Sequence, residues 1–317
     1  MKQRDTFVDI AKGICILLII CIHTEVFGII GMPLTFIAVP MFFFMSGFYD
    51  RSEKPIKEWI GKTIRRLLFP ALVWLIVGNF YLRLLGYLKN GIIEPYVFDW
   101  YNPQGGNGPV WFLIALFYAK ILTGSTIRLK MSKWIIALCS LCVGYIGATY
   151  EMPLLVDEGM AAFPLYYVGK ITYPYLNVIM NRVWLDIMGG IVLVVFITTE
   201  YYYNVGPVKG LYNPCYLLAI LGAMSVFFPI LNISEKMKKN KFLAALGKRS
   251  LEIMLIHTLI CHTFAVILNR IFVVGSYMWI GSFLVAYIFI VFLSYYIGVY
   301  IKNTSQLYFN THMFDAF

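Results

Sequence analysis

The stretch FVDIAKGICILLIICIHTEVFG, residues 7–28, decides the fold class. It is mostly apolar, and its length fits the about 20 residues with which an α-helix crosses a bilayer. Similar runs recur along the chain, because 60% of the 317 residues are hydrophobic and only 13% are charged, against roughly a quarter in soluble domains. The mean hydropathy of +0.75 excludes a water-soluble globule and a disordered chain. The expected solvent is therefore the bilayer.

Charged residues, Pro, Gly and Asn divide the chain into about ten apolar segments. These cover approximately residues 7–29, 33–49, 64–88, 110–127, 133–149, 160–178, 183–200, 212–231, 249–270 and 277–301. No internal repeat divides the chain into similar halves. We therefore expect an all-α, polytopic membrane helix bundle that forms a single domain over residues 1–317.

The Lys and Arg residues indicate the orientation of these segments. If successive gaps alternate between the two sides of the membrane, 21 of the 26 basic residues fall on the side of the N-terminus. Cytoplasmic loops are the ones enriched in Lys and Arg, so both termini are expected in the cytoplasm. The net charge of +10 then reflects membrane orientation and contact with lipids, and it does not indicate a nucleic-acid partner.

The six cysteines lie inside apolar segments, where cysteine usually behaves as a small hydrophobic residue. Cys139 and Cys142 form a C-x-x-C pair, but no second pair and no histidine accompanies it. We therefore expect no disulfide framework and no metal.

Ionisable residues inside the apolar segments are the first candidates for a functional site, because a charge near the centre of a spanning helix costs at least about 2.5–3.5 kcal/mol. Lys12 and His23 are eleven positions apart, which places them within about 20° of one another around a helix and about 16 Å apart along it. Asp9 lies one turn before Lys12 and can pair with it. Glu25 points about 160° away from His23, towards another surface.

A cation at the cytoplasmic end and an imidazole deeper in the helix suit an anionic ligand that enters from the cytosol. Histidine titrates near pH 6.5, so a neutral ring can take a proton from an attacking hydroxyl. A core histidine bonded to a neighbouring helix is the alternative. His257 and His262 lie about 140° apart on a straight helix, and this spacing argues against a metal site.

A basic cluster, Lys62, Arg65 and Arg66, precedes the third segment in KEWIGKTIRRLLFPALVW. Arginine offers a bidentate fork for phosphate, so the cluster is a candidate phosphate site near Lys12. Positive-inside bias or contact with anionic lipid would explain the same cluster.

Several motifs in order along nearly the whole chain resemble the acyltransferase-3 family of integral membrane proteins, which includes bacterial polysaccharide O-acetyltransferases. They are the first helix with Lys12 and His23, VPMFFFMSGFY at 39–49, KTIRRLLFP at 62–70, GPVWFLIALF at 108–117, VDEGMAAFPLYYVGK at 156–170 and GKRSLEIMLIH at 247–257. Family members often have arginine where this chain has Lys12. Two family arginines separated by two residues are matched here by Lys62 and Arg65.

The resemblance implies transfer of an acyl group, usually acetyl, from cytosolic acyl-CoA to a hydroxyl of a surface polysaccharide or a lipid-linked glycan. It places the chain as a multi-pass protein in the bacterial inner, or plasma, membrane. It also implies His23 as the catalytic group, acting as a base on the acceptor hydroxyl or as a transient acyl carrier. The candidate contacts of acyl-CoA are Lys12, Lys62, Arg65, Arg66 and Trp111. Export of a polysaccharide or a lipid-linked glycan is the alternative function.

Overall fold

The computed structural model describes residues 5–24, 28–91, 98–103, 107–180, 182–203 and 216–309. Most residues in these ranges are helical, and the ranges contain no strand. The all-α prediction is thereby confirmed. Glu25 lies outside the described residues.

The helices follow the apolar segments of the sequence. In the first half they are α1 (Thr6–Ile22), α2 (Gly28–Gly47), α3 (Ile56–Thr63), the π-helix η2 (Ile64–Leu68), α4 (Phe69–Asn90), α5 (Val110–Arg128) and α6 (Lys133–Thr149). In the second half they are α7 (Val156–Thr172), α8 (Leu176–Ile179), α9 (Val183–Tyr203), α10 (Tyr216–Ser225), α11 (Phe227–Lys236), α12 (Lys241–Lys248), α13 (Ser250–Ile271) and α14 (Tyr277–Phe309). Two short 3₁₀ turns, η3 (Pro153–Leu155) and η4 (Tyr173–Tyr175), flank α7.

Five helical stretches of the described chain are long and apolar enough to cross a membrane. They are Ile56–Asn90, Val110–Arg128, Tyr216–Lys236, Ser250–Ile271 and Tyr277–Thr304. Their outward faces carry many exposed large hydrophobic side chains, as expected where lipid replaces water. An integral membrane protein follows from these helices, whereas the number of spans and the side of each terminus stay predictions.

The first helix is shorter than the apolar run that encodes it. The run was expected to stay helical to residue 29, but α1 ends at Ile22 and His23 caps it. The hydroxyl of Thr24 donates to the carbonyl of Cys21 at 2.6 Å, a local bond that competes with helical continuation. The amide of His23 still donates to Ile19, so helical phase persists from Lys12 to the histidine.

Prolines explain two irregularities in the long helices. Pro70 has no N–H for the carbonyl of Arg66, four residues earlier, and the chain widens there into η2, where Phe69 donates to Ile64. Pro229 likewise leaves the carbonyl of Ser225 without a helical donor, and α10 and α11 are separated at that point. The two arginines of the basic cluster therefore lie on a π-helical turn.

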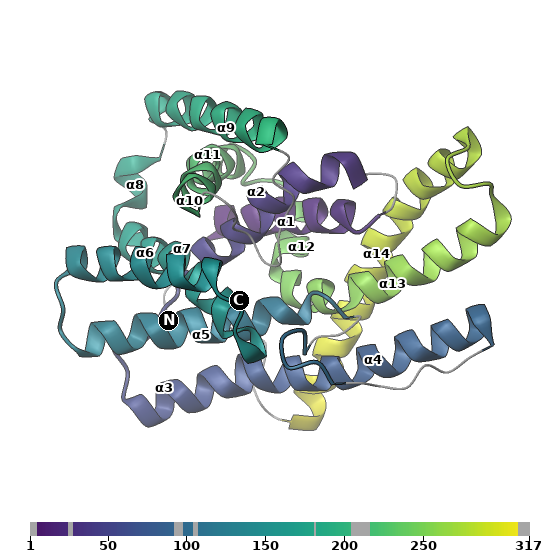
Figure 1. Ribbon diagram of the computed structural model, residues 1–317, viewed down its shortest axis with the longest axis horizontal. Helices are drawn as coiled ribbons and strands as arrows, with labels where there is room; N and C mark the ends of the chain where they lie inside the picture. The colour runs from purple at the N-terminus through teal and green to yellow at the C-terminus, as the bar shows by residue number, and fades with distance from the viewer. Residues whose placement is uncertain are drawn as a thin grey trace.

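Helix α1 lies in the interior of the bundle, with α9 at one edge and α4 at the opposite edge (Figure 1). It packs against α2, α11, α12, α13 and α14. Glycines permit its closest contact: a Cβ on Gly13 would collide with the carbonyl of Leu243, and a Cβ on Gly247 would collide with the carbonyl of Asp9. Small residues allow such close helix approach in membranes. This packing fixes Asp9 and Lys12 inside the protein.

Candidate functional site

Two histidines from distant parts of the chain meet at the end of α1. The ring centroids of His23 and His257 are 5.0 Å apart and the ring planes are inclined by 59°. His23 is exposed on the surface of the folded chain, whereas His257, on α13, is completely buried. His262, on the same helix, is exposed and interacts electrostatically with both rings. One accessible imidazole is thus backed by a buried one.

Asn107, in the segment before α5, links α4 to α13 by hydrogen bonds close to this histidine pair. Asn107 is fully buried, and its amide donates to the carbonyl of Trp74 at 2.9 Å. Its side-chain oxygen accepts from the hydroxyl of Thr258 at 3.2 Å, next to His257 in the chain. A Cβ on Gly78 would strike the Asn107 side chain, so that glycine makes room for it. Asn107 therefore helps to set the position of His257.

Trp111 is the fourth residue of the GPVWF motif and the second residue of α5. It is half-buried, and its ring centroid is 6.2 Å from those of Phe43 and Phe112. These contacts belong to the aromatic packing between α2 and α5. They leave part of the indole accessible.

Lys12 is buried beneath the aromatic rings of Tyr49 and Tyr173 and does not reach the protein surface. It is only 1% exposed, and its ammonium lies 5.6 Å from the ring centroid of Tyr49. Tyr49 contacts Tyr173, whose hydroxyl donates to Asp5 at 2.6 Å. Lys12 thus sits under the end of α2 with aromatic rings between it and the exterior.

The three residues of the basic cluster, Lys62, Arg65 and Arg66, differ in how deeply they are buried. Lys62 is exposed and pairs with Glu58 at 2.6 Å, and Lys54 pairs with the same carboxylate at 3.0 Å. Arg65 is exposed, while Arg66 is half-buried. Lys62 and Arg65 therefore lie at the periphery, and Arg66 is directed closer to the interior.

Arg66 belongs to a second cationic group that the sequence did not single out. Lys120, half-buried on α5, interacts electrostatically with Arg66, Arg51, Lys170 and Asp50. Helix α5 packs against η2, which carries Arg66. Lys120 therefore lies within electrostatic range of three further cations, of which Arg51 is exposed, and of the Asp50 carboxylate that Lys170 binds. This excess of positive charge favours binding of an anion with more than one negative charge. We call Arg51, Arg66, Lys120 and Lys170 the inner cation group.

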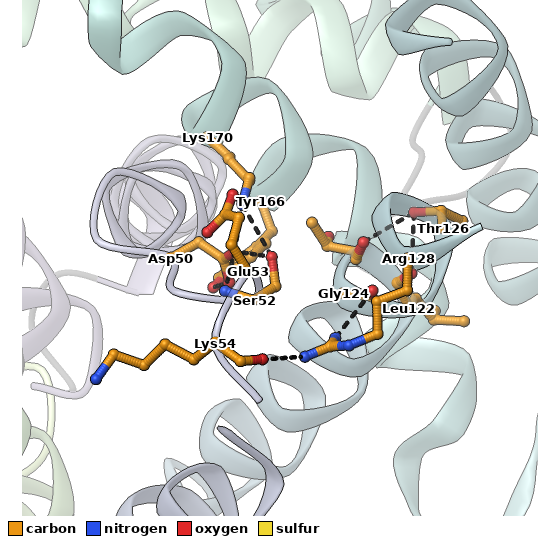
Figure 2. A network of polar contacts seen from close by, with 11 residues as sticks. Asp50, Ser52, Glu53, Lys54, Leu122, Gly124, Thr126, Arg128, Tyr166 and Lys170 are labelled. Carbon is orange, nitrogen blue, oxygen red and sulfur yellow. Dashed lines mark hydrogen bonds and ion pairs between the residues drawn. The ribbon is translucent and has the colours of Figure 1, made fainter. Parts of the chain in front are cut away.

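Asp50 and Lys170 join the loop after α2 to α7 (Figure 2). The ammonium of Lys170 lies 2.7 Å from Asp50 Oδ1 and 2.9 Å from the hydroxyl of Ser52. Tyr166 donates to Asp50 Oδ2 at 2.7 Å. Burial alone would raise the pKa of Asp50, but the charge and hydrogen bond of Lys170, with the bonds from Ser52 and Tyr166, hold it below its ordinary value.

Arg128 fixes the other side of the same loop, also drawn in Figure 2. Its guanidinium donates to the carbonyls of Gly124 and Lys54, each at 3.0 Å. The guanidinium lies 4.2 Å from the ring centroid of Trp59, a cation–π contact that joins α5 to α3. The loop is thereby held from α7 and α5, and it carries α3 and η2 with their arginines.

Sequence reasoning did not find three features of this site: the ring contact of His257, the linking role of Asn107 and the inner position of Lys120. A signal existed for Lys120, because a lysine inside an apolar helix is costly unless it has a function or a partner. Among the described residues, no group of three or more His, Cys, Asp or Glu side chains could hold a metal ion.

A family model described as an acyltransferase domain, that of the acyltransferase-3 family, matches residues 5–299 of the chain. No curated protein and no solved structure matches. The matched range includes both histidines, the inner cation group and every candidate residue named from the sequence.

Proposed function

Because the chain belongs to the acyltransferase-3 family, we propose that this membrane acyltransferase moves an acyl group, acetyl foremost, from cytosolic acyl-CoA to a carbohydrate hydroxyl. The acceptor is a cell-surface polysaccharide or a lipid-linked glycan, and the protein resides in the bacterial inner membrane. One observation carries the proposal: an accessible histidine, His23, lies in a helical bundle that also gathers an inner cation group. An acyl transfer from an anionic carrier requires both features.

The donor binds through its phosphates. Arg66 and Lys120 supply the inner positive charge, and the exposed Arg65 and Lys62 attract the anion at the periphery. Lys12 adds charge from beneath Tyr49. Trp111, half-buried at the start of α5, offers an aromatic face along the path of the acyl arm.

His23 performs the chemistry. Its neutral ring takes the proton of the acceptor hydroxyl while the oxygen attacks the thioester carbonyl. A new C–O bond forms, the C–S bond breaks, and the proton passes from the imidazolium to the departing thiolate. Attack by the ring itself, followed by transfer from an acyl-imidazole, gives the same products in two steps.

Mass spectrometry of surface glycans tests this proposal in cells that carry the wild-type chain, His23→Ala, or neither. We expect ester groups on a glycan only with the wild-type chain, at equal protein levels in the membrane. A glycan exporter would instead lose the polymer while the remaining chains keep their esters. Unchanged ester content in His23→Ala cells would refute a catalytic role of this histidine.

A further inference from the structure

One ring nitrogen of His257 forms a hydrogen bond, and the other has no hydrogen-bond partner among the described residues. Its Nδ1 lies 3.1 Å from the carbonyl oxygen of Ile253, one turn earlier on α13. A carbonyl oxygen only accepts, so Nδ1 must carry the hydrogen of this bond. In the neutral ring, Nε2 is then an acceptor with a free lone pair. The backbone of α13 thus selects one tautomer of His257.

This lone pair has no hydrogen-bond partner among the described residues, although Nε2 is completely buried. A buried polar atom without a partner costs about 1–3 kcal/mol, so a folded protein seldom keeps one without a reason. A metal ion is a poor occupant, since the described residues offer no cluster of ligands around it. The ring of His23 lies close by, with its centroid 5.0 Å away.

We infer that His257 is a positioning residue for His23, an inference that rests on the acyl transfer proposed above. In the working arrangement, His257 Nε2 accepts the N–H of His23. That bond fixes the tautomer of His23 so that its other nitrogen, on the accessible side, is free to take a proton. The ring centroids are 5.0 Å apart, which is close enough for this bond when a nitrogen of each ring faces the other. Catalytic hydrogen bonds are often long before substrate binds.

This arrangement matches a triad in which a base activates the nucleophile and a buried group orients the base. Here the nucleophile is the acceptor hydroxyl, the base is His23 and the orienting group is His257. During transfer, the acceptor hydroxyl gives its proton to His23, and the positive charge on that ring strengthens the bond to His257. The proton leaves to the thiolate of CoA, and His257 stays neutral throughout. The exposure of His23 and the complete burial of His257 match these two roles.

Two substitutions separate positioning from packing. Gln in place of His257 carries an acceptor near the position of Nε2, whereas Asn reaches only the position of Nδ1 and retains the contact with Ile253. In membrane vesicles supplied with acetyl-CoA, we expect His257→Gln to keep kcat within about tenfold and His257→Asn to lose about 100-fold or more, with KM unchanged in both. Equal activity of wild type and both variants would overturn the inference.

Nitrogen-15 spectra of histidine-labelled protein provide a second test, and the wild-type spectrum alone can decide it. We expect His257 protonated at Nδ1 and His23 in a single tautomer, and we expect His257→Asn to convert His23 into a mixture. A tautomer mixture of His23 in the wild type would overturn the inference even if both variants failed to fold. Absence of acyl transfer by the wild type itself would instead count against the proposed function.

Discussion

Replacing Lys170 with Met should destabilise the protein, because it removes the cation that holds the loop after α2 against α7. The Asp50 side chain is 0% exposed, while that of Lys170 is 16% exposed. Met keeps most of the aliphatic length and loses the charge. The substitution therefore leaves a buried carboxylate with only its neutral donors, Ser52 and Tyr166.

The distance between Lys170 Nζ and Asp50 Oδ1 gives the expected loss of stability. At an effective dielectric constant of about 20, unit charges separated by the 2.7 Å between Nζ and Oδ1 attract by about 6 kcal/mol before desolvation is subtracted. Removing one partner of a buried pair costs about 3–5 kcal/mol. We expect about 3 kcal/mol for Lys170→Met, because Lys170 is partly exposed in the wild type and Asp50 keeps three neutral donors, two from Ser52 and one from Tyr166. In an Asp50→Asn background the same change should cost far less, since no buried carboxylate is left uncompensated and Glu53, the other carboxylate that pairs with Lys170, is exposed.

Unfolding of the purified protein in detergent, followed by tryptophan fluorescence, measures these differences. The pKa of Asp50 in the folded protein lies below its ordinary 3.8, so its ionised form stabilises the protein above that pH. The stabilisation is lost as the pH falls through the folded pKa, so the difference between wild type and Lys170→Met should shrink as the pH approaches that range. A loss below about 1 kcal/mol at pH 7, or no coupling with Asp50→Asn, would refute the importance of this pair.

Two further predictions concern packing and donor binding. Gly247→Ala should destabilise the protein by about 1–3 kcal/mol or more, because its Cβ collides with the backbone carbonyl of Asp9. Gly86→Ala is the matched control in the same unfolding assay, since nothing lies within 4 Å of its Cβ, and equal effects would contradict the packing argument. Lys120→Met should raise the KM for acetyl-CoA about tenfold, because it removes a charge-assisted contact of about 1.5 kcal/mol. Lys89→Met, near the C-terminal end of α4, should leave the KM unchanged. An unchanged KM in Lys120→Met vesicles would remove Lys120 from the donor site.

The apolar runs predicted the helices well, because lipid forces the backbone to satisfy its own hydrogen bonds. The end of α1 was missed, since the run stays apolar beyond His23 and the bond of Thr24 is a local detail. The spacing of Lys12 and His23 identified a shared helix face. It did not reveal that Tyr49 covers Lys12, which depends on where α2 ends.

The partner of His23 could not be predicted from local spacing. His257 lies far along the chain, and its contact with His23 depends on the packing of α13 beside α1. The angular argument compared His257 only with His262 on its own helix. It could not compare residues on two helices whose relative rotation was unknown. Lys120 was not identified from the sequence, because its neighbours on η2 and α7 come from other parts of the chain.

Release of CoA from acetyl-CoA by inside-out membrane vesicles tests most directly whether His23 performs the transfer. The vesicles expose the cytoplasmic face, contain the natural acceptor, and allow free thiol to be measured for wild type and His23→Ala at equal protein content. We predict thiol release by the wild type and a loss of about 100-fold or more in His23→Ala. Release at the wild-type rate from the His23→Ala vesicles would contradict the account.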